Sequence, residues 1–456
     1  MAKNEMVMTE GNLFKKLLFF SIPLALSGIL QLLYNACDLI VCGLFGSQHS
    51  VAAISATNSL INLIVQLFLG LSVGANVLMS RYYGEKNKEA AQRIAYTSMI
   101  LSVIFGLIIG IFGFCCSKFF LIWMDTPNDI INLSTSYLMI YFIGIPFSMI
   151  YNFGASILRA LGDTKRPFYF LMIAGIFNIL LNLFFVIVFK LDVKGVAIAT
   201  IISQAVSAFL IVLCLCKNDG FIHFKFRELR FHPKEALLIA RVGLPAGLQG
   251  AIFSLSNVLI QSSINSLGTA VVGGNGASSS LEGFIYTAMN SVAQASVAFV
   301  SANYGAQKKK NIQKSILYAI ILVMLMNFIV GALILLLQDP LLKLYVRDSA
   351  SIEAGKQRLI IIACTYFLCG FMDTFAFALR GIGYSILPTI ISLLGACGFR
   401  IIWIYTVFPI DKYHNISGLA ISYPISWIIT ASCHLILFVI LFSKIKFANQ
   451  SVTNQN

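Results

Sequence analysis

The chain has 456 residues, of which 58% are hydrophobic and only 11% are charged. Together with a mean hydropathy of +0.86, this composition excludes a soluble globular protein and indicates a protein that crosses a membrane several times. The formal net charge of +14 at pH 7 invites a nucleic-acid partner, but the sequence has no basic domain that would carry such a role. We therefore expect no binding to nucleic acid.

Long apolar segments recur along the whole chain, and each is close to the roughly 20 residues that a helix needs to cross a bilayer. They predict an all-α polytopic membrane protein with about twelve transmembrane helices. In chain order, the predicted spans are 14–36, 51–79, 94–116, 132–155, 167–189, 194–216, 236–264, 272–300, 315–338, 357–379, 389–408 and 416–442.

The basic residues are distributed unevenly between the predicted loops. Most of the 32 Lys and Arg lie in the two tails and in every second loop, on one side of the predicted membrane. An excess of Lys and Arg marks the cytoplasmic side of a membrane protein. The pattern predicts that both termini are cytoplasmic, and it explains the net charge without nucleic acid.

The two halves of the chain repeat each other at a lag of about 221 residues. The segment "FSIPLALSG" (20–28) aligns with "VGLPAGLQG" (242–250), and "LRALGDTKRP" (158–167) aligns with "LRGIGYSILP" (379–388). Each half holds six predicted spans, an even number, so both halves enter the membrane in the same direction. The sequence therefore predicts two parallel six-helix repeats.

The repeat also predicts the domain organisation. We expect four parts, namely an N-terminal lobe (1–216), a cytoplasmic linker (217–235), a C-terminal lobe (236–443) and a cytoplasmic tail (444–456). Two parallel bundles with a central cleft between them are typical of an alternating-access carrier. The sequence has no GxxxxGK[ST] phosphate-binding motif and no HExxH metal motif. We therefore expect neither an enzyme nor an ATP-driven pump, and no cofactor.

Four segments together resemble the multidrug and toxic compound extrusion (MATE) transporters, bacterial type. They are "YNACDLIVCG" in the first span, "LRALGDTKRP" after the fourth, "NILLN" in the fifth and "GVAIATIISQ" in the sixth. The resemblance covers about residues 13–443. It implies a V-shaped pair of six-helix lobes in a bacterial plasma membrane. It also implies export of organic cations and other amphipathic drugs in exchange for protons or sodium ions. We expect a monomer surrounded by membrane lipid.

Of the 18 acidic residues, only Asp38, Glu282 and Asp373 fall inside predicted spans. An acid at the centre of a membrane helix costs about 2.5–3.5 kcal/mol on insertion scales, so each of them calls for a physical reason. Asp38 can serve as the group that couples transport to an ion. The alternative is a hydrogen bond between helices from a protonated side chain.

The resemblance implies an ion-coupling site in the N-terminal lobe, formed by Asp38, Asn178, Asn182 and Thr200. If the ion is sodium, these four residues are its ligands, since carboxylate, amide and hydroxyl oxygens suit a hard cation. Related bacterial members often have an aspartate where this chain has Asn182. The departure leaves the number and identity of the coupling ions open. The alternative for Asn178 and Asn182 is a pair of packing amides one helical turn apart.

A second group is predicted to bind the cargo in the C-terminal lobe. Glu282, Tyr286 and Asn290 lie four residues apart, and therefore on nearly one face of a helix. Glu282 resembles the family's eighth-helix acid, and a carboxylate beside aromatic rings suits a lipophilic cation. Asp373 and Arg400 complete the predicted group. The alternative for Glu282 is a buried ion pair with Arg400.

A flippase for a lipid-linked or other polar metabolite is the alternative function of related architecture. Its cleft would need several basic residues inside the membrane to hold a pyrophosphate. Within the predicted spans Arg400 stands nearly alone. The sequence therefore favours the ion-coupled antiporter.

Overall fold

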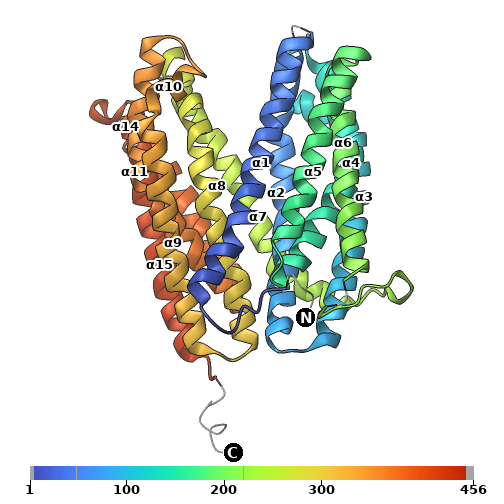
Figure 1. Ribbon diagram of the computed structural model, residues 1–456. Coiled ribbons are helices and arrows are strands. Elements are labelled where there is room, and N and C mark those ends of the chain that lie inside the picture. The colour runs from blue at the N-terminus through green and yellow to red at the C-terminus, as the bar shows by residue number, and fades with distance from the viewer. Residues whose placement is uncertain (1–4, 48, 219, 448–456) are drawn as a thin grey trace, which may run out of the picture. The chain divides into compact units, whose positions relative to one another are not determined.

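The structure is a computed structural model that describes residues 5–47, 49–218 and 220–447. Within these ranges every regular element is a helix (Figure 1). The α-helices are α1 (Leu13–Phe45), α2 (Ser50–Gly84), α3 (Lys88–Trp123), α4 (Ile131–Ala160), α5 (Lys165–Leu183), α6 (Asp192–Cys216), α7 (Pro233–Asn265), α8 (Thr269–Gly305), α9 (Lys309–Leu336), α10 (Gln338–Lys343), α11 (Ser349–Gly381), α12 (Ile386–Ser392), α13 (Phe399–Thr406), α14 (Ile416–Ala420) and α15 (Ser422–Lys444). Two π-helical segments, η1 (Phe184–Val188) and η3 (Leu393–Gly398), and two 3-10 turns, η2 (Phe226–Glu228) and η4 (Asp411–Tyr413), complete the set.

Each predicted span corresponds to a long helical stretch, three of which join consecutive elements (α5–η1, α12–η3–α13 and α14–α15). In the described part of the chain, 11 stretches are long and apolar enough to cross a membrane. The exception is α8, whose 37 residues include the polar run "GGNGASSS". The helices are also longer than predicted, because charged turns continue them beyond their apolar parts. Thus α3 begins at Lys88 and not at residue 94.

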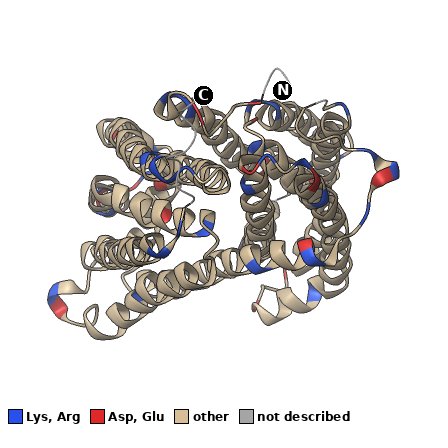
Figure 2. Cartoon of the chain, turned by 90° about the horizontal axis from the view of Figure 1, so that it is seen from below, with Lys and Arg blue, Asp and Glu red and all other residues tan. Residues whose placement is uncertain are grey.

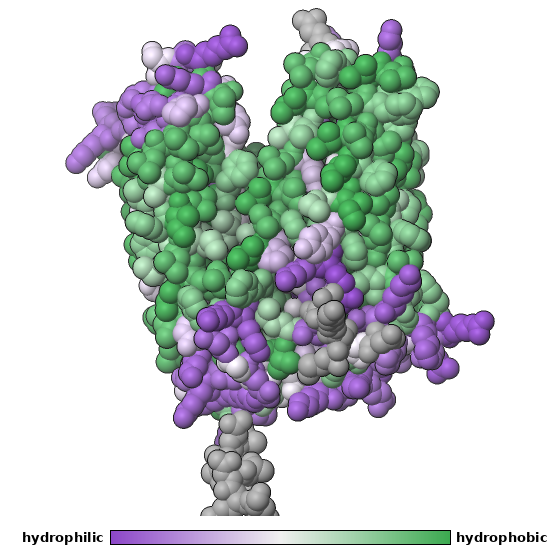
Figure 3. Space-filling model, viewed as in Figure 1, coloured by the Kyte–Doolittle hydropathy of each residue, from purple (hydrophilic) through white to green (hydrophobic). Residues whose placement is uncertain are grey.

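Charged residues avoid the bodies of the helices. In Figure 2 most of the helical coils carry neither Lys, Arg, Asp nor Glu, and several charged residues lie in connecting segments. Figure 3 shows apolar side chains along the helix walls and hydrophilic ones near the helix ends. Such a surface is expected of helices whose walls face lipid.

Short polar side chains define where several helices begin. The side chain of Asn87 accepts a hydrogen bond from the Ala90 N–H at 3.0 Å at the start of α3. Asp348 accepts from the Ser351 N–H at 2.7 Å at the start of α11. These N-caps satisfy backbone donors that the first helical turn leaves without a partner.

The chain folds into two compact units. Among the described residues, the first unit contains residues 5–6, Leu26–Met79 and Asn87–Ala251, and the second contains Val7–Ala25, Ser80–Lys86 and residues 252–447. These boundaries differ from those of the predicted lobes, because α1 and α7 each divide between the two units and the last residues of α2, from Ser80 to Gly84, belong to the second unit. The linker is also shorter than predicted, since α7 already begins at Pro233. The predicted tail lies outside the described residues from residue 448 onward.

Contacts within each unit explain why α1 and α7 divide. In the second unit, the ring of Phe20 in α1 packs at 90° on Phe299 of α8, with 5.4 Å between centroids. In the first unit, the early part of α7 lies so close to α2 that a Cβ on Gly70 would be 2.0 Å from the Gly247 nitrogen. The points at which α1 and α7 pass from one unit to the other lie close to Pro23 and Pro245. These prolines have no backbone N–H to donate within their helices.

The loop after α4 gives a prediction about stability. Gly162 has a φ of +90°, and a Cβ there would lie 2.3 Å from the Met6 carbonyl oxygen. We expect Gly162→Ala to lower the free energy of unfolding, by roughly 1–2 kcal/mol for the left-handed backbone and further for the clash. Thermal unfolding in detergent measures the loss.

Gly383, the counterpart of Gly162 in the repeat, provides the control for this prediction. It has a φ of +102°, but a Cβ there would meet nothing within 4 Å. Gly383→Ala should therefore show the backbone effect without the clash. Equal losses of stability in the two variants would mean that Met6 does not pack on Gly162.

Candidate ion-coupling and cargo sites

Three helices of the first unit bring the four predicted ion-coupling residues into one hydrogen-bonded group. Asp38 lies on α1, Asn178 and Asn182 lie one turn apart on α5, and Thr200 lies on α6. Asn182 Nδ2 donates to Asp38 Oδ1 at 2.6 Å, and the Thr200 hydroxyl donates to Asp38 Oδ2 at 3.4 Å. Asn178 Nδ2 donates to Thr200 Oγ1 at 3.3 Å, and Asn178 Oδ1 accepts from Asn182 at 3.2 Å.

This group is closed off and rich in oxygen. The exposed fractions of Asp38, Asn178 and Asn182 are 7%, 5% and 0%. The Oδ1 atom of Asn182 is buried and accepts no hydrogen bond, and such an atom calls for a ligand, since buried polar atoms are normally satisfied. One carboxylate, two amides and a hydroxyl suit a hard monovalent cation, and the carboxylate alone suits a proton.

The surroundings of Asp38 are apolar on one side. Val41 and Cys42, in the next turn of α1, belong to a buried cluster with Val186, Val193 and other side chains. Val186 lies in η1, the π-helical segment that begins two residues after Asn182. Single π-helical turns are frequent at functional sites. The cluster keeps water from one side of the carboxylate.

In the second unit, Glu282 of α8 forms a buried ion pair with Arg358 of α11. Arg358 Nε donates to Oε1 and its Nη2 donates to Oε2, each at 2.8 Å. The Ser278 hydroxyl also donates to Oε1 at 2.8 Å. Each side chain of the pair is 6% exposed. This two-pronged geometry neutralises the carboxylate and satisfies both of its oxygens.

The alternative that pairs Glu282 with Arg400 is wrong, and so is the statement that Arg400 stands nearly alone within the predicted spans. The partner of Glu282 is Arg358 and not Arg400. Nor does Arg400 stand nearly alone, since Arg358 and Arg380 are also buried, with 5% and 4% exposed. Arg358 lies at the edge of the predicted span 357–379, where a charge normally faces the membrane interface. Because α11 already begins at Ser349, Arg358 lies well inside a packed helix.

Arg400 instead rests against aromatic rings. Its guanidinium carbon is 4.1 Å from the ring centre of Tyr423 and 5.7 Å from that of Trp427. Its Nε atom donates to Ser426 Oγ at 3.0 Å. Arg358 lies over the same Tyr423 ring at 5.1 Å. Cation–π contacts of this kind stabilise a guanidinium in an apolar surrounding.

Asp373 belongs to a separate polar group with Asn290 and Tyr286. Asn290 Nδ2 donates to Asp373 Oδ2 at 3.0 Å and to the Tyr286 hydroxyl at 3.2 Å. Gln294, one turn further along α8, donates to Asn290 Oδ1 at 2.6 Å. Tyr286 is 39% exposed and Asp373 only 8%. The group therefore leads from an exposed ring to a buried carboxylate, and Gln294 is a member that the sequence analysis missed.

Comparison with known proteins bears on what these groups do. A family model, MatE, matches residues 23–184 and again residues 245–406. The two matches cover most of the chain and confirm the internal repeat. Each match begins within the first predicted span of its half and ends within the fifth.

Individual relatives match over most of their length. The probable multidrug resistance protein YoeA of Bacillus subtilis is 25% identical over 433 residues, which is 92% of each chain. The probable multidrug resistance protein YpnP of the same organism is 29% identical over 79% of this chain and 81% of its own. Among solved structures, a multidrug resistance MATE family transporter in an outward-facing conformation has a TM-score of 0.89 at 23% identity, covering 97% of this chain and 98% of that one.

Proposed function

The chain belongs to the MatE family, and from this premise we propose that it exports amphipathic organic cations across a bacterial plasma membrane in exchange for protons or sodium ions. Transport by alternating access is the mechanism typical of a carrier built from two parallel six-helix repeats. The observation that carries the proposal is the buried group around Asp38. A carboxylate with neutral oxygen ligands and one unsatisfied amide oxygen is what a coupling site for a monovalent cation needs.

In this proposal the Asp38 carboxylate binds either its present hydrogen-bond donors or the coupling ion, but not both at once. In the structure its oxygens accept from Asn182 on α5 and Thr200 on α6. A sodium ion would replace these donors, because the Asn182 amide must turn to present its free Oδ1 atom to the cation. A proton on Asp38 would likewise change which of the two oxygens accepts. Ion binding therefore alters the contacts of α1 with α5 and α6.

The cargo site is proposed to lie at Asp373, Asn290 and Tyr286. The Asp373 carboxylate has an amide partner, and the exposed Tyr286 ring offers a face for a cation. Glu282 is a weaker candidate, since Arg358 already neutralises it. Arg358 is equally unavailable to a pyrophosphate, and this disfavours the flippase alternative.

The experiment that tests the function uses purified protein in liposomes with a fluorescent organic cation. A pH gradient and a sodium gradient are imposed separately, and the dye concentration on each side is followed. We expect one of the gradients to drive the dye against its own concentration gradient. Dye movement that ignores both gradients would rule out an ion-coupled antiporter.

The Asn182 position allows a direct test of the coupling site. Asn182→Asp adds a second carboxylate beside Asp38, so the affinity for a cation should rise by roughly tenfold, as the charge of a ligand set governs its affinity. The sodium concentration that half-saturates thermal stabilisation measures this change. Asn152→Asp is the control, because Asn152 lies in α4 and bonds to the Ser148 carbonyl oxygen. An unchanged sodium and pH response in Asn182→Asp would remove residue 182 from the site.

A further inference from the structure

The segment between α6 and α7 is fastened to α3 at two places. At the first, the His223 N–H donates to Gln92 Oε1 at 3.1 Å, and the Lys225 N–H donates to the Tyr96 hydroxyl at 3.4 Å. At the second, the His232 N–H donates to Thr97 Oγ1 at 3.3 Å. We call the chain from residue 223 to residue 232, which includes η2, the arch.

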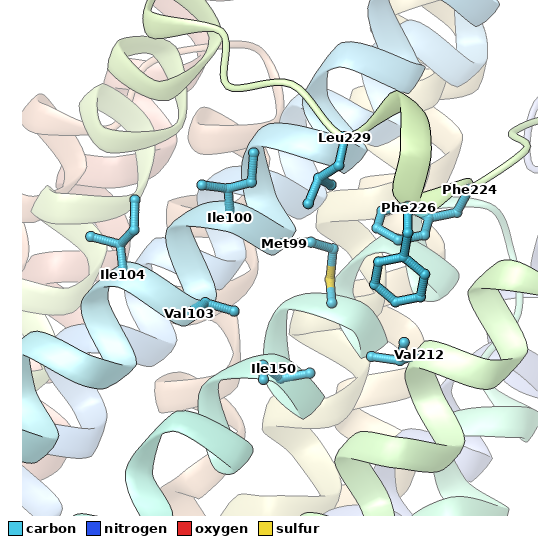
Figure 4. A pocket seen from close by; sticks show the side chains of 9 residues that line it. All are labelled: Met99, Ile100, Val103, Ile104, Ile150, Val212, Phe224, Phe226 and Leu229. Carbon is cyan, nitrogen blue, oxygen red and sulfur yellow. The ribbon is translucent and has the colours of Figure 1, made fainter.

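A cavity lies beneath this arch (Figure 4). It measures about 390 Å³, within the range of small-molecule sites. Its walls come from α3, α4, α6 and the arch, and all of its lining residues are apolar: Met99, Ile100, Val103, Ile104, Ile150, Val212, Phe224, Phe226 and Leu229. Val103 and Ile104 are 39% and 42% exposed. The cavity therefore opens on the apolar wall of the helices, which faces lipid in a membrane.

The arch itself carries cations and exposed aromatic rings above this apolar space. Phe226 and Phe231 are 63% and 46% exposed. Lys225 pairs with Glu228 at 3.0 Å, and the hydrogen bond from Lys225 lowers the pKa of the Glu228 carboxyl, so that both stay charged and cancel. Arg227 and Arg230 are exposed and add positive charge beside this neutral pair. Aromatic rings next to Arg or Lys are typical of segments at the lipid headgroup level.

We propose that this cavity is a binding site for one anionic phospholipid, with an acyl chain under the arch and its phosphate on Arg227 and Arg230. The apolar lining offers no partner to a polar cargo, whereas a hydrocarbon chain needs none. The two cations above it complement a phosphate, which Arg binds through paired N–H donors. Met99–Ile104 lie near the start of the apolar part of α3, the depth at which an acyl chain meets its headgroup. Since the arch is part of the connection between α6 and α7, the bound lipid holds this connection against α3.

The test measures lipid that stays bound to purified full-length protein. The protein is washed in detergent and incubated with phosphatidylglycerol or phosphatidylethanolamine, and bound lipid is counted by native mass spectrometry. We expect one tightly held phosphatidylglycerol. Arg227→Gln with Arg230→Gln should weaken its retention by roughly tenfold or more. Val212→Phe, which fills the cavity, should remove it while the arginines remain.

The matched control is Lys86→Gln with Lys88→Gln, which removes the same charge from two exposed residues, one between α2 and α3 and one at the first position of α3. This control should retain lipid like the wild type. If the control loses as much bound lipid as the arginine variant, the effect comes from general surface charge and the proposal is overturned. Three other results would overturn the proposal as well. They are lipid retention by the Val212→Phe variant, binding of phosphatidylethanolamine as tight as that of phosphatidylglycerol, and equally tight binding of glycerol phosphate, which has no acyl chains. Displacement of the lipid by the transported dye would make the cavity a cargo site instead.

Discussion

Asp38→Asn is expected to abolish ion-driven export while leaving the protein folded. The amide has nearly the size of the carboxylate and can still bond to Asn182 and Thr200, the two present partners of Asp38. It can neither take up a proton nor supply the negative charge that a sodium ion needs. We expect the rate of gradient-driven efflux from liposomes to fall by at least about tenfold, the order of effect that follows from losing a charged group in a coupling step.

Three further measurements make this result specific. Dye binding and thermal stability of Asp38→Asn should stay near the wild-type values, because its cargo site and packing are unchanged. Asp38→Glu should keep partial activity, since one extra methylene must fit a packed site. Asp129→Asn, which alters an exposed acid in a loop, should transport normally. If Asp38→Asn concentrates dye at the wild-type rate, Asp38 only packs helices together and Asp373 becomes the next candidate.

The coupling group illustrates what the sequence could predict. The spacing of Asn178 and Asn182 alone places them on one face of a helix, and the structure adds the bond between them. That Asp38 and Thr200 meet them could not be read from spacing, because the contact joins three helices far apart in sequence. The resemblance to a family supplied that link, and the hydrogen bonds now show the contact. Their role in coupling stays a prediction.

The missed Arg358 shows where reasoning from hydropathy fails. Arg358 is the second residue of the predicted span 357–379, a position at which hydropathy predicts a charge at the membrane interface, whereas α11 already begins at Ser349. The sequence does contain a signal, which is the helical spacing of Gly355, Arg358 and Ile362. In the structure all three residues are buried. An arginine on the buried face of a helix calls for a carboxylate, and Glu282 was one of only two acids inside the predicted spans of that half.

The division of α1 and α7 between the units could not have been predicted. Both helices are apolar over long stretches, so the sequence pattern marks no face and no segment for one bundle or the other. Only the packing partners decide, such as Phe299 for the early part of α1 and Gly70 for the early part of α7. The repeat therefore predicts how many helices each half contributes, and tertiary contacts decide where each unit begins.

The second large effect is expected from breaking the Glu282–Arg358 pair. Glu282→Gln leaves the buried Arg358 guanidinium without its carboxylate, and removing one partner of a buried pair costs about 3–5 kcal/mol of stability. Thermal unfolding in detergent should therefore shift strongly downward. Arg358→Gln should have a similar effect, because it leaves Glu282 with only the Ser278 hydroxyl. Organic cations and neutral dyes should lose transport equally in both variants, as the loss lies in folding.

The double variant Glu282→Gln with Arg358→Gln separates charge from packing. Two neutral amides can bond to each other, so the double variant should be more stable than either single variant. Asp373→Asn is the contrasting change, because it should spare stability and weaken the binding of cationic dyes more than that of neutral ones. A stable Glu282→Gln protein with a selective loss of cation transport would contradict this assignment. It would show that Arg358 releases Glu282 during the transport cycle, so that its carboxylate meets the cargo.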